Sequence, residues 1–191
     1  MSAHGGGLEQ LRSELGRHDW SALRSYLGGA SQLPSAIEAL VFAESSQDAK
    51  AAYWRIDNVA LVQGRLSESV YALTSCLLVG LPFAKAVGRG AIFDLLATIA
   101  GGHDEHIDNE IVGTVSVREC VLLMERCLPI FVEEVQRGNP SCVDIVLMCA
   151  IYEPRLRGHV IEVFERALEN PACVPIVDLI ENSMVDLRDE E

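Results

Sequence analysis

The sequence predicts an all-α protein in which helices follow one another in pairs along the chain. Apolar residues recur with helical spacing, and capping residues and glycines mark where helices start and stop. Strand signals are nearly absent, with no sustained apolar–polar alternation and no Asn-Gly hairpin turn. The 191 residues, 49% of them apolar, suffice for one domain with a sizeable core or at most two small domains.

Helix starts are predicted at five places. Asp19 precedes an apolar segment as an N-cap would. Ser35–Glu38 and Ser116–Glu119 have the spacing of a capping box, in which the serine oxygen accepts an early backbone N–H and the glutamate reaches back to the cap. Asn139-Pro140 and Asn170-Pro171 each place a capping residue before a proline suited to the first helical position. Predicted helix stops are Gly28-Gly29, Gly64, Gly101-Gly102 and Gly138.

Two segments show the helical period most clearly. Across residues 156–168 the apolar side chains fall on one helix face and charged ones such as Glu162 on the other. Residues 117–135 show a similar pattern with Pro129 inside it. Because the pattern continues past this proline, we expect Pro129 to bend the helix rather than end it.

An internal repeat is the most specific feature of the sequence. Residues 139–146 read Asn-Pro-Ser-Cys-Val-Asp-Ile-Val, and residues 170–177 read Asn-Pro-Ala-Cys-Val-Pro-Ile-Val, with six of eight positions matching at a separation of 31. Each copy follows an amphipathic helix that ends in charged residues. A helix, a short turn and a second helix that recur at this interval indicate an α-solenoid, in which each pair covers the apolar face of its neighbour.

The same region resembles a HEAT repeat. Residues 126–143 read Arg-Cys-Leu-Pro-Ile-Phe-Val-Glu-Glu-Val-Gln-Arg-Gly-Asn-Pro-Ser-Cys-Val. The family has a first helix with an internal Leu-Pro, here Leu128-Pro129, and a turn rich in Asp, Asn or Pro, here Asn139-Pro140. Asp144 stands where the family often has Arg, so that side-chain ladder is missing from this chain.

Two earlier stretches extend the resemblance over most of residues 20–188. Residues 87–100 resemble a HEAT second helix, and residues 51–64 resemble bacterial HEAT-like proteins of poorly defined function. Some small acidic proteins of this kind look like immunity proteins of bacterial toxin systems. The resemblance implies a HEAT/armadillo-like α-α superhelix of about four to five helical pairs, and it implies a function only through that likeness.

The predicted organisation is a single α-solenoid domain over residues 1–191. Residues 1–7 are expected to be a flexible start because of their glycine run, and residues 8–34 to form N-terminal capping helices. The first two helical pairs are expected within residues 35–101, and the last two within residues 116–188.

Charge is unevenly spread along the chain. The net charge is −13, but residues 1–100 carry 9 acidic and 8 basic side chains, whereas residues 101–191 carry 19 and 7. The acidity argues against binding to DNA or RNA, which needs clustered Lys and Arg. The acidic second half is interpreted either as a surface for a basic partner or as an aid to solubility.

The compartment is expected to be the cytoplasm. The N-terminus lacks a basic segment followed by an apolar run, so it does not read as a signal peptide. The most apolar stretch, residues 70–84, is short for a membrane span and is broken by Gly80 and Pro82. The six cysteines sit in apolar company without any Cys-x-x-Cys pair, which favours reduced core side chains over a metal site.

A polar loop, residues 101–110, holds the densest group of candidate ligands. It reads Gly-Gly-His-Asp-Glu-His-Ile-Asp-Asn-Glu, and its imidazoles and carboxylates are groups that bind divalent metals. A His-x-x-His pair in a glycine-led loop lacks the rigidity of a helical site. Three interpretations are kept: a connection between repeats, a partner-binding loop, or a metal site. We expect no metal and no cofactor.

Few other residues suggest chemistry. Trp54 with Arg55 and Asp57 is interpreted either as an interface anchor or as solenoid packing with local ion pairs. The chain has no Gly-x-Ser-x-Gly, no phosphate-cradling loop and no His-Glu-x-x-His, so we expect no enzymatic activity. HEAT-like DNA glycosylases exist, but they use a basic groove that a chain of net charge −13 does not suggest.

The leading functional hypothesis is a cytoplasmic immunity protein that neutralises a bacterial toxin by covering its active site with an acidic surface. An acidic surface reaches a basic cleft quickly through electrostatic steering. The alternative is a scaffold or adaptor that binds cellular proteins without inhibiting them. The partner is expected to be a protein with a basic surface, not nucleic acid or membrane. The expected contact residues are Asp104, Glu105, Asp108, Glu110, Glu133, Glu134, Trp54, Arg55 and Asp57.

Overall fold

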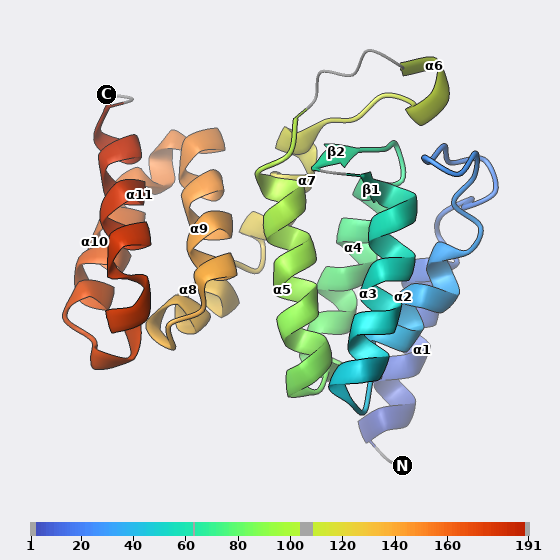
Figure 1. The fold of residues 1–191 in the computed structure, drawn as a ribbon, viewed down its shortest axis with the longest axis horizontal. Coiled ribbons are helices and arrows are strands. Elements are labelled where there is room, and N and C mark those ends of the chain that lie inside the picture. The colour runs from blue at the N-terminus through green and yellow to red at the C-terminus, as the bar shows by residue number, and fades with distance from the viewer. Residues whose placement is uncertain (1–2, 63, 104–108, 190–191) are drawn as a thin grey trace. The chain divides into compact units, whose positions relative to one another are not determined.

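The computed structural model describes residues 3–62, 64–103 and 109–189, and these form an all-α protein (Figure 1). Its chain divides into two compact units, Met1–Cys120 and Val121–Glu191, and α7 (Val117–Glu125) crosses the division. The all-α prediction is therefore confirmed.

The first unit is built from two helical hairpins with an additional helix packed against them. One hairpin pairs α2 with α3, the other pairs α4 with α5, and α1 packs mainly on α4. The two hairpins contact each other through α2 with α4 and α5, and through α3 with α5. The helices of this unit are α1 (Ala3–Leu15), α2 (Leu33–Val41), α3 (Ser46–Ala60), α4 (Val70–Gly80), the 3-10 turn η1 (Leu81–Phe83), α5 (Ala86–Ala100) and α6 (Asn109–Val112).

The second unit repeats the hairpin arrangement. It consists of an α8–α9 hairpin and an α10–α11 hairpin, packed together through α9 with α11 and through α10 with α8 and α9. Its elements are α8 (Leu128–Gln136), α9 (Pro140–Tyr152), the 3-10 turn η2 (Pro154–Leu156), α10 (Arg157–Leu168), the 3-10 segment η3 (Pro171–Ile176) and α11 (Val177–Asp189). Buried aliphatic and aromatic side chains such as Phe131 and Phe164 fill the space between the helices.

The two copies of the repeated octapeptide fold differently. The first copy opens α9 directly, with Asn139 as N-cap and Pro140 in the first turn, as predicted. The second copy forms η3 before α11 begins. Pro175 stands where the first copy has Asp144, and it has no N–H to donate to the carbonyl four residues earlier. The proline therefore keeps this segment in a 3-10 conformation.

The predicted caps at Asn170 and Ser116 are confirmed by hydrogen bonds, with the Ala172 N–H donating to Asn170 Oδ1 at 3.0 Å. The backbone N–H of Glu119 donates to Ser116 Oγ at 3.2 Å, at the start of α7. The capping box at Ser35–Glu38 is wrong, because α2 already begins at Leu33 and Glu38 instead accepts the Arg12 guanidinium at 2.9 Å. This contact joins residues that lie 26 positions apart, which local spacing does not foresee.

The N-terminal region differs from the prediction. Residues 16–32 form turns rather than a capping helix, and α1 begins at Ala3, inside the segment expected to be a flexible start. Asp19 is not a helix cap. Its Oδ1 accepts the backbone N–H groups of Ser21 and Ala22 at 3.2 and 3.3 Å and so closes a local turn.

Pro129 does not bend one long helix, as was predicted, but lies in the first turn of a second one. Helix α7 ends at Glu125 and α8 begins at Leu128. The chain makes tight turns between them, with the N–H of Cys127 bonded to the carbonyl of Met124 at 2.8 Å. Because a proline fits the start of a helix but not its interior, the break falls just before Pro129.

A small hairpin of strands in the first unit was not predicted from the sequence. Strands β1 (Leu61–Val62) and β2 (Arg65–Leu66) pair antiparallel after α3. Gly64, predicted as a helix stop, has a φ of 76° and serves the turn between them. Arg65 also forms an isolated bridge with His103, which ties the segment after α5 to the hairpin.

Candidate functional site

A groove between α3 and α5 is the strongest candidate site. The two helices lie side by side in the first unit (Figure 1), and between them is a groove of about 390 Å³. Its walls are two helical stripes, in which successive members are three or four residues apart and so share one face. The lining residues are Ser46, Ala49, Lys50, Tyr53 and Trp54 on α3, and Val87, Gly90, Ala91 and Asp94 on α5.

Three of the residues that line the groove are small. Ala49, Gly90 and Ala91 have a methyl group or no side chain, and so they fill little of the space between the two helices. A Cβ atom built at Gly90 would meet no atom within 4 Å, so the space above this glycine is unfilled. By contrast, a Cβ at Gly88, half a turn earlier, would lie 2.3 Å from the Leu40 carbonyl oxygen. Gly88 therefore serves packing, whereas Gly90 contributes to the groove.

Trp54 stands on the edge of the groove with 49% of its surface exposed. Its ring meets the Tyr53 ring edge to face, with centroids 5.4 Å apart and planes at 86°. The other tryptophan, Trp20, is 7% exposed and donates its indole N–H to the Leu15 carbonyl at 2.8 Å. An exposed tryptophan beside an apolar hollow is the kind of residue that anchors protein interfaces.

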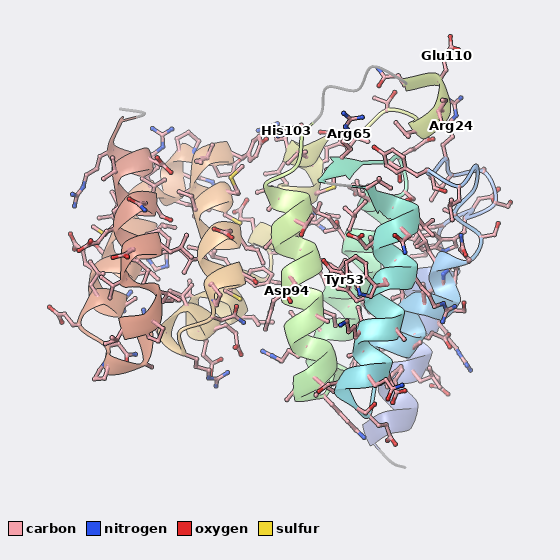
Figure 2. All side chains as sticks on the ribbon, in the orientation of Figure 1. Arg24, Tyr53, Arg65, Asp94, His103 and Glu110 are labelled. Carbon is pink, nitrogen blue, oxygen red and sulfur yellow. The ribbon has the colours of Figure 1, made fainter. Side chains whose placement is uncertain are left out.

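The two ends of the groove differ in charge. Lys50 lies toward the start of α3, and Asp94 lies farther along α5, close to Tyr53 (Figure 2). Burial raises the pKa of Tyr53, and the negative charges of Asp57 and Asp94 raise it further. Burial also raises the pKa of the Asp57 carboxyl. The Tyr53 end is therefore an aromatic and carboxylate environment, while the Lys50 end is cationic.

The structure separates the three residues that the sequence grouped around Trp54. Trp54 lines the groove, whereas Arg55 donates to the Ser35 hydroxyl of α2 at 2.7 Å. Asp57 is half-buried and lies near enough to Tyr53 to affect its titration. Of the predicted trio, Trp54 thus lines the groove, Asp57 is not among the lining residues but lies near Tyr53, and Arg55 belongs to the contact between α2 and α3.

Some of the acidic residues that were predicted as partner contacts lie in the described part of the chain, and others do not. Asp104, Glu105 and Asp108 lie outside the described residues. Glu110 is exposed on α6. Its backbone carbonyl and that of Asn109 each accept Arg24 Nη1 at 3.2 Å (Figure 2). Arg24 thereby joins the turn segment after α1 to α6.

Glu133 and Glu134 share one arginine. Arg137 donates to Glu133 Oε1 at 2.5 Å and to Glu134 Oε1 at 2.7 Å, all within the last turns of α8. The Glu134 side chain is only 12% exposed. These two carboxylates are therefore partly neutralised within their own helix and present less charge to a partner than the sequence suggested.

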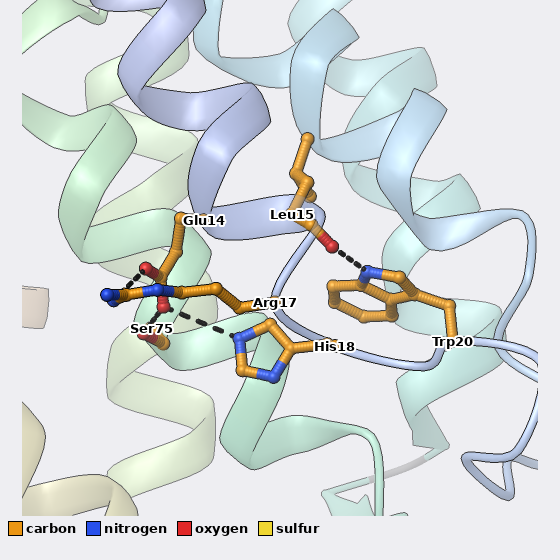
Figure 3. Close-up of polar contacts among 6 residues, drawn as sticks. All are labelled: Glu14, Leu15, Arg17, His18, Trp20 and Ser75. Atoms are coloured by element: carbon orange, nitrogen blue, oxygen red, sulfur yellow. Dashed lines mark hydrogen bonds and ion pairs between the residues drawn. The ribbon is translucent and has the colours of Figure 1, made fainter.

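A polar cluster at the end of α1 was not predicted. The Glu14 carboxylate accepts hydrogen bonds from the Ser75 hydroxyl of α4 at 2.5 Å and from Arg17 Nη1 at 3.0 Å (Figure 3). His18 Nε2 lies 3.4 Å from Oε1 of the same carboxylate. Burial works to raise the Glu14 pKa, but the hydrogen bonds from Ser75 and Arg17, the Arg17 charge and the nearby His18 imidazole outweigh it and lower the pKa. The cluster joins α1 to α4. The spacing of Arg17 and His18 at three and four residues after Glu14 was the signal that the sequence offered.

The thiols of this chain are structural. All six cysteines are free, and five are buried, as expected for small core side chains. Burial raises the pKa of Cys76 and of Cys149 to about 12, with the charges of Glu14 and Glu125 adding to the effect. These groups stay protonated at neutral pH and are poor nucleophiles and metal ligands.

Two features are absent from the described residues, a cluster of metal-ligating side chains and a membrane-spanning helix. Within the part of the chain that the structure describes, no three His, Cys, Asp or Glu side chains converge as a metal site would need. Across the same residues, no helix combines the length and the apolar character required to cross a bilayer.

Comparison with known proteins adds no relative. No protein-family model, curated protein or solved structure matches this chain.

Proposed function

We propose that this protein works by binding another protein, and that the groove between α3 and α5 is where the partner docks. The observation that carries the proposal is the half-exposed Trp54 in a groove that small residues also line, with open space at Gly90. Burying a tryptophan and filling such a hollow would contribute much of the free energy of a protein interface.

The arrangement of hairpins supports the α-solenoid form of this proposal. In each unit, successive helical hairpins stack so that the second helix of one lies against the second helix of the next, α3 on α5 and α9 on α11. In stacked-repeat proteins, such rows of helices create extended binding surfaces. The groove lies in the row formed by α3 and α5, which is where a HEAT-like solenoid would hold a partner.

The narrower proposal is a cytoplasmic immunity protein that covers the active site of a toxin. It is supported by the HEAT-like resemblance and by acidity, since residues 121–191 carry 14 acidic and 6 basic side chains. Such a surface would steer a basic toxin toward the chain before the groove engages it. The alternative is an adaptor without inhibitory action. Expression of the adjacent gene by itself separates them, because a toxic product that this chain neutralises supports immunity and a harmless product supports the adaptor.

Photo-crosslinking at the groove tests the binding proposal directly. A photoreactive phenylalanine analogue replaces Trp54 in the native host, and crosslinked products are identified by mass spectrometry. Tyr71 provides the matched control, because it is an aromatic residue of the same unit that is 43% exposed but does not line the groove. We expect a discrete protein adduct at position 54 and none of that mass at position 71. Equal adducts at both positions, or none at position 54, would contradict the proposal.

A further inference from the structure

We propose that the segment of the partner that occupies the groove between α3 and α5 is a short amphipathic α-helix, which lies lengthwise in the groove and places a large aliphatic side chain over Gly90. This inference rests on the proposed function and names the kind of segment that docks. It commits to a helical segment in preference to an extended or a proline-rich one.

The direction of the two walls sets the shape of the groove. Helix α3 leads into strand β1, and α5 leads to His103, which bridges to Arg65 of the same hairpin, so the two helices run in the same direction (Figure 1). The lining residues span positions 46–54 of α3 and 87–94 of α5. At a rise of about 1.5 Å per residue, each wall is roughly 11 Å long, or about two helical turns. A channel of this length between two parallel helices matches a third helix laid along them.

The backbone of the groove walls is already hydrogen-bonded. The lining residues all lie in α3 (Ser46–Ala60) and α5 (Ala86–Ala100), whose interior N–H and C=O groups pair within each helix. An extended peptide gains affinity by pairing with an exposed sheet edge, and neither β1 nor β2 lines the groove. An extended segment would therefore bury unpaired peptide groups at a cost in free energy. A helix pairs its own backbone groups and can be buried against side chains alone.

The position of the aromatic residues disfavours a proline-rich segment. Such segments bind in grooves lined by aromatic rings. Both aromatic residues that line this groove, Tyr53 and Trp54, belong to α3. The facing wall presents Val87, Gly90 and Ala91 instead. The groove thus has one aromatic edge and one wall of small aliphatic residues, which suits the apolar stripe of a helix.

The small residues allow a helix to approach closely. The distance between two packed helices depends on the size of the side chains at their contact. A Cβ at Gly90 would meet nothing within 4 Å, and Ala49 and Ala91 add no more than a methyl group each. An aliphatic side chain of the docked helix fills this space. Trp54, which is 49% exposed, then contacts a second apolar side chain three or four residues away on the same helix face.

The net charge of the chain indicates the polar face of the docked helix. A helix that lies in a groove keeps its outer face in solvent, where it experiences the electrostatic field of the whole protein. With a net charge of −13, this field attracts cations. We therefore expect lysine and arginine on the outer face.

Selection from three peptide libraries tests which conformation the groove accepts. The displayed peptides have about 14 residues, enough for about four helical turns. Two libraries share one composition, with apolar residues at i, i+3, i+4 and i+7 in the first and at alternate positions in the second, and the third carries Pro-x-x-Pro. The full chain is the bait, and peptides that also bind Gly90→Leu are removed, so that the retained peptides require the open groove.

We expect the retained peptides to come from the helical library. They should bind the matched control Gly158→Leu as tightly as the wild type, because that glycine is in α10 of the second unit. In nuclear magnetic resonance spectra of the full chain, they should shift the indole N–H resonance of Trp54. The Trp20 resonance should stay fixed, because that N–H is buried and bonded to the Leu15 carbonyl.

A proline substitution in the tightest-binding peptide gives a second measurement that needs no variant of the protein. Proline at a central position of its polar face should break the helix and weaken binding at least about tenfold, whereas alanine at the same position should leave the affinity unchanged.

The helix assignment would be overturned by retained peptides from the alternating or proline-rich library, by none from the helical library, by an unmoved Trp54 resonance, or by equal affinity of the proline and alanine peptides. None of those results bears on whether position 54 crosslinks to a protein in the native host, so the two proposals fail separately.

Discussion

The two units place their hairpins together in different ways. In the second unit the turns of the two hairpins fit closely, with Asn170 Nδ2 donating to the Gln136 carbonyl at 2.7 Å and Cys173 Sγ lying 3.2 Å from the Val135 carbonyl oxygen. In the first unit, α3 and α5 instead leave a groove of about 390 Å³ between their facing stripes. One contact is closed by specific hydrogen bonds, and the other is left open by small residues.

The close packing of the second unit is marked by a sequence repeat, whereas the groove of the first unit is not. The second copy of the repeated octapeptide supplies Asn170 and Cys173, which close the contact between the hairpins of the second unit, so this copy contributes to packing. The groove depends on the small size of the residues at positions 49, 90 and 91, which are Ala49, Gly90 and Ala91, and no sequence motif marks these positions. The strongest sequence signal and the best candidate site therefore lie in different units.

The largest expected effect is at the closed contact. Gly138 has a φ of 81°, and a Cβ there would lie 2.3 Å from the Ala172 carbonyl oxygen. Gly138→Ala should lower the free energy of unfolding by about 3 kcal/mol, the sum of a left-handed backbone penalty and overpacking against backbone. Urea titration measures it.

Gly28→Ala is the matched control for this substitution. Gly28 has a similar φ of 91°, but a Cβ there would meet nothing within 4 Å. It should lose only the backbone penalty, about 1 kcal/mol. Equal losses in the two variants would show that the turns of the second unit are not closely packed.

A smaller effect is expected at the polar cluster that joins α1 to α4. The Glu14 pKa is lowered below 4.5, so its carboxylate stabilises the fold above that pH and the stabilisation is lost as pH falls through the lowered pKa. Glu14→Gln should cost about 1 kcal/mol at pH 7, the value of lost hydrogen bonds to a charged group. The gap from wild type should close toward pH 3. Urea titrations at both pH values check this, and a gap that is constant with pH would contradict it.

The smallest effect has the opposite sign and lies in the open groove. Gly90 is inside α5 with a Cβ site free of contacts, so Gly90→Ala should raise the free energy of unfolding by about 0.7 kcal/mol through helix propensity. Thermal unfolding followed by circular dichroism measures it. A destabilised variant would mean that the space above Gly90 is not open.

Sequence reasoning predicted the helical class and some helix boundaries, because those depend on neighbours along the chain. The Ser116 cap and the Asn139-Pro140 start are of this kind. The prediction failed where a residue far away in the sequence determines a side chain's partner. Glu38, for example, bonds to Arg12 instead of capping its own helix. The groove was foreseen only through Trp54, since a small residue such as Ala91 looks the same whether a neighbour fills the space beside it or not.

The central claim is that a partner protein docks in the groove between α3 and α5. The most direct measurement is the yield of the position-54 crosslink after Gly90→Leu, compared with the yield after Gly158→Leu. Both glycines lie in helices, and a Cβ at either site would meet nothing within 4 Å, but Gly158 lies in α10 of the second unit. We predict that Gly90→Leu fills the groove and reduces the crosslink at least about tenfold, as for loss of an interface anchor, while Gly158→Leu leaves it unchanged. Equal yields in the two variants would contradict the account.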